Sequence, residues 1–192
     1  SLITTAPPDR LAIRTYFMEF DPVIIREALI REYNRGGQSF FVVPRIKDIE
    51  EVRIFLEEEL SDLKYLVATG QMTGNTLDKV MNAFYEGKAD ILLSTSIVES
   101  GLDVPNANTL IAYKADLFGL SQLYQIRGRV GRSKLRAYSY LTVEQGKKIT
   151  SNGEKRLNLL AGIDSLGEGF NLASQDLDIR GSGNLLGDEQ SG

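Results

Sequence analysis

The chain has 192 residues, of which 42% are hydrophobic and 25% charged, which suits one α/β domain with a small appendage. It contains no cysteine and no histidine. Disulfides, thiolate chemistry, zinc sites built from these residues and histidine-dependent triads are therefore excluded. The formal net charge of −4 gives no general attraction to nucleic acid, so any such contact must be local.

Membrane and export signals are absent from these residues. No run of about 18 apolar residues occurs, and residues 1–8 lack the basic region that begins a signal peptide. We therefore expect no membrane contact, a cytoplasmic location and no metal site within this sequence.

The first predicted helix begins at Asp21-Pro22, an N-cap acceptor followed by a proline at the first helical position. Gly36-Gly37 is expected to end it. Its apolar stripe is predicted to consist of Ile25, Ala28, Leu29 and Tyr33.

Strands and helices then alternate along the chain. A strand at 39–43 precedes a helix whose apolar residues are Ile49, Val52 and Leu56. A strand at 65–68 precedes a helix with an apolar stripe formed by Leu77, Val80, Met81 and Phe84. Further strands are predicted at 91–93, 109–113 and 137–142.

This alternation predicts an α/β fold with a mostly parallel sheet covered by helices on both faces. Ligands of such sheets bind beyond the carboxyl ends of the strands. The segments at those ends are 44–45, 69–72, 94–105 and 114–119. Each of them is either part of a binding site or a simple connector.

The character of the chain changes after about residue 143. A polar connector at 145–153 leads to predicted helices at 154–163 and 167–173, and residues 176–192 form a glycine-rich segment with little periodicity. We therefore divide the chain into an α/β unit at 1–145 and a helical hairpin with an extended strap at 146–192.

Arginines and amides are concentrated at residues 122–132. If this segment is helical throughout, four residues share one side: Gln122, Gln125, Arg129 and Arg132. Arginine forks match phosphate oxygens, so this side suits a dense anion at the ligand edge of the sheet. Ion pairs with carboxylates of the same domain are the alternative.

The pattern Gln-x-x-Gly-Arg-x-Gly-Arg at 125–132 resembles motif VI of superfamily 2 helicases, whose motor domains have a RecA-like fold. The resemblance implies that two arginines reach ATP held by a preceding motor domain. Arg132 would be the arginine finger, Arg129 would contact the γ-phosphate, and Gln125 would join the contact between the two domains.

Residues 94–105 follow the 91–93 strand and resemble motif V of the same family. The hydroxyls of Ser94 and Thr95 suit a DNA phosphate, a contact that positions DNA without reading its sequence. The resemblance implies that the nucleotide is approached by Glu99, Gly101 and Asp103. Without the family, this segment indicates only a turn.

Two further positions resemble DNA-contacting motifs of these helicases. Gly70 and Gln71 match the short motif that touches the tracking strand, and Arg45 stands where motif IV is expected. For Arg45, an ordinary surface arginine is the alternative.

The end of the chain resembles the translocation motif shared by RecG-type enzymes and transcription-repair coupling factors. Arg180 and Gln190 match the polar residues that tie the strap to the hairpin, although Arg180 could instead pair locally with Asp176 or Asp178. Residues 113–123 and 165–174 resemble the coupling factors more closely, as does the short connection after Pro44.

The resemblance implies the second motor domain of an ATP-dependent translocase on double-stranded DNA. ATP and Mg²⁺ would be bound mainly by the first motor domain. RNA polymerase, which a coupling factor displaces when it stalls, and excision-repair proteins would bind regions outside this sequence. The alternatives are a RecG-type enzyme that remodels branched DNA and a doubly wound binding domain without motor activity.

The first testable prediction concerns ATP turnover by these 192 residues alone. The sequence lacks Gly-x-x-x-x-Gly-Lys-Ser/Thr and Asp-Glu-x-His, so it has no phosphate loop and no magnesium box. We expect the purified chain to show no ATP hydrolysis above background in a phosphate-release assay. Turnover that co-elutes with the chain through gel filtration would contradict this expectation.

Overall fold

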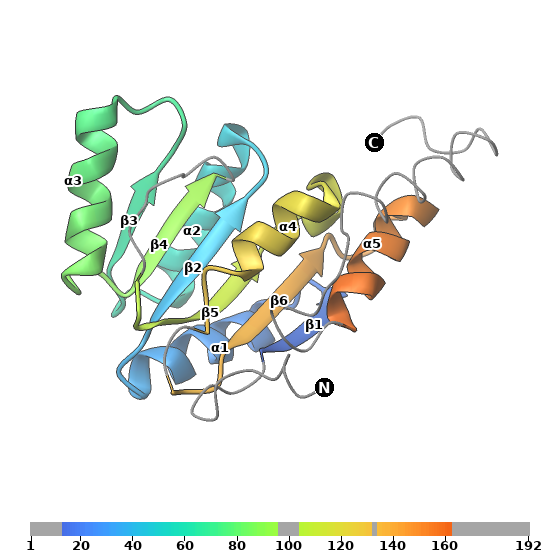
Figure 1. The fold of residues 1–192 in the computed structure, drawn as a ribbon, viewed down its shortest axis with the longest axis horizontal. Helices are drawn as coiled ribbons and strands as arrows, with labels where there is room; N and C mark the ends of the chain where they lie inside the picture. The colour runs from blue at the N-terminus through green and yellow to red at the C-terminus, as the bar shows by residue number, and fades with distance from the viewer. Residues whose placement is uncertain (1–12, 96–103, 132–133, 163–192) are drawn as a thin grey trace, which may run out of the picture.

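The computed structural model describes residues 13–95, 104–131 and 134–162. Six parallel strands form its sheet in the order β1-β6-β5-β2-β4-β3 (Figure 1). The strands are β1 (Arg14–Glu19), β2 (Gln38–Val43), β3 (Tyr65–Ala68), β4 (Ile91–Thr95), β5 (Ala107–Ala112) and β6 (Tyr138–Val143). The predicted parallel sheet is confirmed.

Helices cover both faces of this sheet, as the alternation predicts (Figure 1). One face carries α1 (Pro22–Asn34) and α2 (Ile49–Glu59), and the other carries α3 (Gly74–Tyr85), α4 (Leu120–Arg127) and α5 (Ser151–Ala161). Successive strand residues point to opposite faces, so Phe41 packs in the core under α1 and α2 while Val42 packs under α4 and α5. The layers expected of a RecA-like fold, a parallel sheet with helices on both faces, are confirmed.

The start of α1 agrees with the sequence, because Asp21 Oδ1 accepts a hydrogen bond from the Val23 N–H at 3.0 Å. Its inward face differs from the prediction. Ile25, Ala28 and Leu29 are buried, but Tyr33 is 46% exposed. The buried position belongs to Glu32, which is 1% exposed, so the assignment of Tyr33 to the apolar stripe was wrong.

Glu32 is buried because its charge is fully partnered. Its carboxylate accepts bonds from Arg35 Nε and Nη2 at 2.9 and 2.7 Å and from Thr109 Oγ1 at 2.6 Å. Arg35 Nη2 also donates to the carbonyl oxygen of Arg136 at 2.6 Å. The group therefore ties the end of α1 to the amino ends of β5 and β6.

Strand β1 was not among the strands predicted from the sequence. It is an edge strand that pairs only with β6 among the described strands, and its side chains alternate irregularly between exposed and half-buried. Tyr16 stacks on Tyr140 of β6 with ring centroids 5.2 Å apart. Because β1 lacks a fully buried face, its sequence carries no clear two-residue period.

Helix α5 packs against the core formed by α4 and this face of the sheet. Leu157 and Leu160 are fully buried in the cluster that also contains Phe118 and Leu141, and Thr150 Oγ1 caps the helix by accepting from the Gly153 N–H at 3.0 Å. The boundary between residues 145 and 146 stays a prediction, and the expected helix at 167–173 and strap at 176–192 lie outside the described residues. None of the described helices is long and apolar enough to cross a membrane.

The packing of α5 generates a stability prediction. Leu157→Ala leaves a cavity in the shared core and should lower the free energy of unfolding by about 2–5 kcal/mol, measured by urea denaturation. Lys155→Ala, an exposed position of the same helix, is the matched control and should change it by less than about 0.5 kcal/mol. Equal, small effects of both changes would mean that α5 contributes nothing to the core.

Candidate functional site

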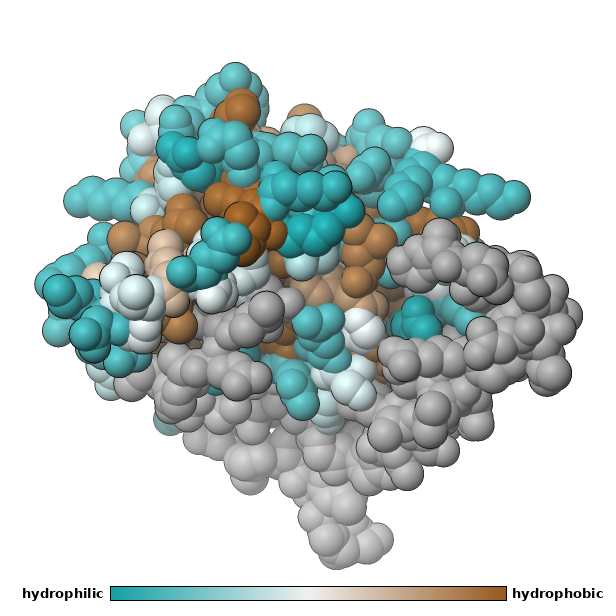
Figure 2. Space-filling view, turned by 90° about the horizontal axis from the view of Figure 1, so that it is seen from above, coloured by the Kyte–Doolittle hydropathy of each residue, from teal (hydrophilic) through white to brown (hydrophobic). Residues whose placement is uncertain are grey.

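The carboxyl ends of the parallel strands gather at one edge of the sheet, toward which the arrows point in Figure 1. The chain leaves β2 toward β3 and leaves β5 toward β6, and β2 and β5 are neighbours. The topological switch point therefore lies between them, where a doubly wound sheet forms its ligand crevice. Figure 2 shows the molecule from above, where the coloured surface is mostly hydrophilic and apolar residues are visible among the hydrophilic ones.

Two of the predicted DNA-contacting segments meet at this edge. The Gly70 N–H donates to Thr95 Oγ1 at 3.3 Å, which links the turn after β3 to the end of β4. Gly70 and Gln71 are exposed, whereas Ser94 and Thr95 are each 3% exposed. The Thr95 hydroxyl accepts the Gly70 bond and keeps its own hydrogen to donate.

Arg45 follows β2 at the same edge and is held by a carboxylate. Its Nε lies 3.0 Å from Asp48 Oδ2 and its Nη2 lies 3.3 Å from Asp48 Oδ1. The Arg45 side chain is 42% exposed, while that of Asp48 is 1% exposed. One side of the guanidinium is thus paired, and the rest of the side chain reaches solvent.

The arginine-rich segment differs from the continuous helix considered in the sequence analysis. Helix α4 ends at Arg127, Gly128 is its C-cap, and Gly131 has a left-handed backbone with φ 80°. The Gln122 amide oxygen accepts from the Gly119 N–H at 3.3 Å and so caps its own helix. The common face required a continuous helix, and that condition is not met, because Arg129 lies beyond the end of α4.

The end of α4 also lies away from the carboxyl edge. A β-carbon placed on Gly131 would be 3.1 Å from Ile13 and 3.4 Å from Ala137, which precede β1 and β6. A helix that follows a parallel strand runs back along the sheet, so its carboxyl end reaches the amino ends of the strands. Gly131 therefore lies near the amino ends of β1 and β6, whereas the expected place of Arg129 and Arg132 at the ligand edge stays a prediction.

Several candidate residues remain untested by this geometry. Gln125 is exposed and Arg129 is half-buried, at or just after α4. The other candidates lie outside the described residues, and their roles stay predictions: Glu99, Gly101, Asp103, Arg132, Arg180 and Gln190.

Sequence reasoning missed the role of Arg127. This side chain is fully buried, and its Nε donates to Thr15 Oγ1 at 2.8 Å, which joins the last turn of α4 to β1. The run of arginines was the available signal, but which arginine points inward depends on where the helix ends.

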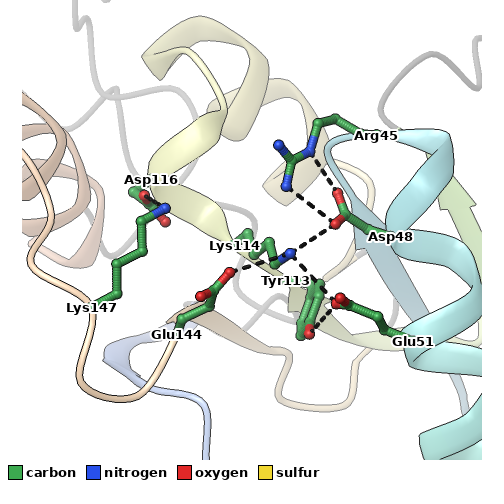
Figure 3. A network of polar contacts seen from close by, with 8 residues as sticks. All are labelled: Arg45, Asp48, Glu51, Tyr113, Lys114, Asp116, Glu144 and Lys147. Carbon is green, nitrogen blue, oxygen red and sulfur yellow. Dashed lines mark hydrogen bonds and ion pairs between the residues drawn. The ribbon is translucent and has the colours of Figure 1, made fainter. Parts of the chain in front are cut away.

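A buried lysine, also missed, connects three loops of the carboxyl edge (Figure 3). Lys114 Nζ lies 2.9 Å from Asp48 Oδ1, 3.2 Å from Glu144 Oε1 and 3.4 Å from Glu51 Oε2. Its side chain is 9% exposed. The signal was its position at the carboxyl end of a predicted strand, but its partners are far away in the sequence.

These contacts shift the pKa values of the network. Burial alone would raise the pKa of the Asp48 carboxyl, but hydrogen bonds from Arg45 and Lys114 outweigh it and hold the pKa below its ordinary value. Burial would lower the pKa of the Lys114 ammonium, yet its bonds to Asp48 and Glu144 raise it. Burial and the bond to Glu51 raise the pKa of Tyr113, so all these groups keep their ordinary charge near neutral pH.

The lowered pKa of Asp48 predicts a dependence of stability on pH. A carboxyl whose pKa is lower in the folded state stabilises the fold above its unfolded pKa, about 3.9, and loses that contribution as pH falls through the folded value. The difference in unfolding free energy between the parent and Asp48→Asn should therefore shrink as pH drops below about 4.

Denaturant unfolding across a pH series measures this difference. Asp78→Asn, which changes an exposed carboxylate on α3, is the control and should differ little from the parent throughout. If the difference in unfolding free energy between the parent and Asp48→Asn stayed constant over the pH series, the Asp48 charge would not stabilise the fold.

Known proteins resemble this chain in sequence and in fold. Over its whole length the chain is 56% identical to the transcription-repair-coupling factor of Rickettsia prowazekii (strain Madrid E) and 48% identical to that of Bacillus subtilis (strain 168). It spans only 17% and 16% of those two proteins.

The solved structures agree with the fold. RecG bound to a three-way DNA junction is similar with a TM-score of 0.77 and 36% identity, over 94% of this chain and 24% of that one. The second helicase domain of the DEAD-box protein Mss116p, bound to an RNA duplex, is similar in fold, with a TM-score of 0.60 and 19% identity over 87% of this chain and 68% of that one. Residues 23–134 match the helicase conserved C-terminal domain, and the chain belongs to that family.

Proposed function

We propose that this chain is the second motor domain of an ATP-dependent double-stranded DNA translocase of the transcription-repair coupling type. The observation that carries the proposal is the identity of 48–56% to such factors along the whole chain. The complete protein would displace a stalled RNA polymerase and promote excision repair in the cytoplasm. Contacts with polymerase and repair proteins would come from the part of the relatives that this chain does not cover.

DNA would bind at the carboxyl edge through local contacts. The Thr95 hydroxyl, the exposed turn at Gly70 and Gln71, and the Arg45 guanidinium offer donors suited to phosphate oxygens. These contacts are independent of base sequence, which suits a protein that moves along a duplex. The overall net charge of −4 does not prevent these contacts, because exposed charges more than a Debye length from the phosphate are largely screened.

The end of α4 and the segment that follows it would contact the nucleotide. The exposed Gln125 amide and the Arg129 guanidinium are donors that fit phosphate oxygens presented by another domain. In the described ranges 13–95, 104–131 and 134–162, no group of three Asp or Glu residues could hold a metal ion. We assign Mg²⁺ and most ATP contacts to the first motor domain, with Glu99, Gly101 and Asp103 approaching the nucleotide from this side.

ATP bound between the two domains supplies the phosphoryl group whose transfer drives movement. This chain would place Arg132 and Arg129 where negative charge develops, and such arginines contribute about 10³- to 10⁵-fold in rate. Arg180 and Gln190 would connect the nucleotide state to the strap.

A RecG-type enzyme is the second candidate, supported by the 36% identity to RecG over most of this chain. Movement on linear duplex DNA distinguishes the two, since an enzyme specialised for branched DNA acts mainly on junctions. The family match gives no support to a binding domain without a motor role.

Arg132→Ala in the protein that contains both motor domains tests the proposal. Loss of the arginine finger should lower DNA-dependent ATP turnover by about 10³-fold or more and abolish translocation, while thermal unfolding stays unchanged. Lys134→Ala, an exposed cation two residues away, is the control and should retain near-parent turnover. Near-normal turnover in Arg132→Ala would remove this residue from the mechanism.

A further inference from the structure

Lys114 has an unusual backbone conformation at the end of β5. Its φ and ψ are 50° and 51°, and it is the only residue other than glycine with a positive φ among the described ranges. A left-handed conformation costs free energy for a side chain with a β-carbon and persists only when its surroundings stabilise it. Here it turns the chain directly into the 3-10 turn η3 (Ala115–Leu117) and then into α4.

The Lys114 ammonium is held by carboxylates from three segments. An ammonium has three donors, and three carboxylates lie within 2.9–3.4 Å of Nζ. Asp48 lies in the turn after β2, Glu51 in the first turn of α2, and Glu144 just after β6 (Figure 3). The ammonium position is thus set by three segments that are distant in the sequence.

One of these carboxylates is shared with the predicted DNA contact. Asp48 Oδ1 accepts from Lys114 Nζ at 2.9 Å and from Arg45 Nη2 at 3.3 Å, and Oδ2 accepts from Arg45 Nε at 3.0 Å. A DNA phosphate bound by Arg45 would compete with Asp48 for the guanidinium. If Arg45 turned toward that phosphate, Asp48 would keep Lys114 as its remaining cationic partner.

Helix α4 connects Lys114 to the opposite end of the sheet. Leu120 and Leu123 hold it against the core, and the Arg127–Thr15 bond holds its last turn on β1. A displacement of the first turn of α4 would reach its last turn through the backbone hydrogen bonds of the helix. Arg129 directly follows the C-cap, so it would share that displacement.

We propose that Lys114 is a positioning residue that couples the DNA-facing Arg45 loop to α4 and to the arginines that follow it. This inference rests on the proposed motor function and adds the route by which DNA contact reaches the nucleotide. Lys114 itself touches neither ligand. Its effect is on how strongly DNA stimulates ATP turnover.

The test uses the protein with both motor domains and measures ATP turnover with and without linear duplex DNA. The stimulation ratio is the turnover with DNA divided by the turnover without it. Lys114→Gln should lower this ratio by about tenfold, a typical coupling between two sites, while turnover without DNA stays within about twofold of the parent value. Lys114→Arg keeps the charge and the donors, so it should retain most of the ratio. DNA affinity, measured by fluorescence anisotropy, should change by less than about threefold, because Arg45 is still present.

A matched control and a milder variant separate coupling from folding. Lys147 lies at the same edge with Asp116 at 3.4 Å, outside the Lys114 network, so Lys147→Gln should leave the ratio unchanged. Glu144→Gln removes the charge of one of the three carboxylates around Lys114. The Glu144 side chain is 44% exposed, so this change should lower the stimulation ratio by about threefold without loss of thermal stability.

The possible results separate failure of the Lys114 coupling role from failure of the proposed motor function. A parent-like ratio in Lys114→Gln and Glu144→Gln would overturn the coupling role alone. So would a parallel fall of both turnover rates and of thermal stability that Lys114→Arg does not rescue, since that pattern marks a purely structural lysine. A parent protein whose turnover does not respond to DNA would overturn the proposed motor function as well.

Discussion

The buried contact between Lys114 and Asp48 organises the functional edge of this domain. A buried ion pair contributes little net stability compared with an apolar pair, but removal of one partner leaves an uncompensated charge and costs several kcal/mol. Its consequence here is geometric. Because the ammonium also contacts Glu51 and Glu144, the segments after β2, β5 and β6 keep one arrangement relative to one another.

That arrangement separates two kinds of contact along the sheet. The donors suited to DNA lie at the carboxyl ends of β2, β3 and β4, whereas α4 runs back so that Arg127 bonds to Thr15 near the start of β1. Under the proposed motor function, ATP and DNA would bind at different places and still influence each other, so such a separation is expected. In the proposed coupling, α4 would be the physical link between the two, with the polar network before its first turn and the buried Arg127 at its end.

Local patterns were sufficient for most of the fold. The start of α1, the apolar stripes of α2 and α3, and strands β2 to β6 follow from apolar period and turn residues. These agree with the structure, although Leu77 and Val80 of α3 are only partly buried. Errors arose where a distant partner overrides the local pattern. Glu32 replaces Tyr33 on the inward face because Arg35 and Thr109 satisfy its charge, and β1 has no clear period because it lies at an edge.

The sequence by itself determined the fold class, the family and which segments carry the candidate DNA and nucleotide residues, because these properties reside in short patterns of neighbouring residues. Only the tertiary structure decided where α4 ends, which arginine is buried and that Lys114 meets three carboxylates. Those features depend on side chains separated by 30 to 66 positions (Glu144 and Asp48 from Lys114) or by 112 positions (Arg127 and Thr15). No local pattern encodes such pairings, since burial and charge compensation arise only when the packed sheet brings those segments together.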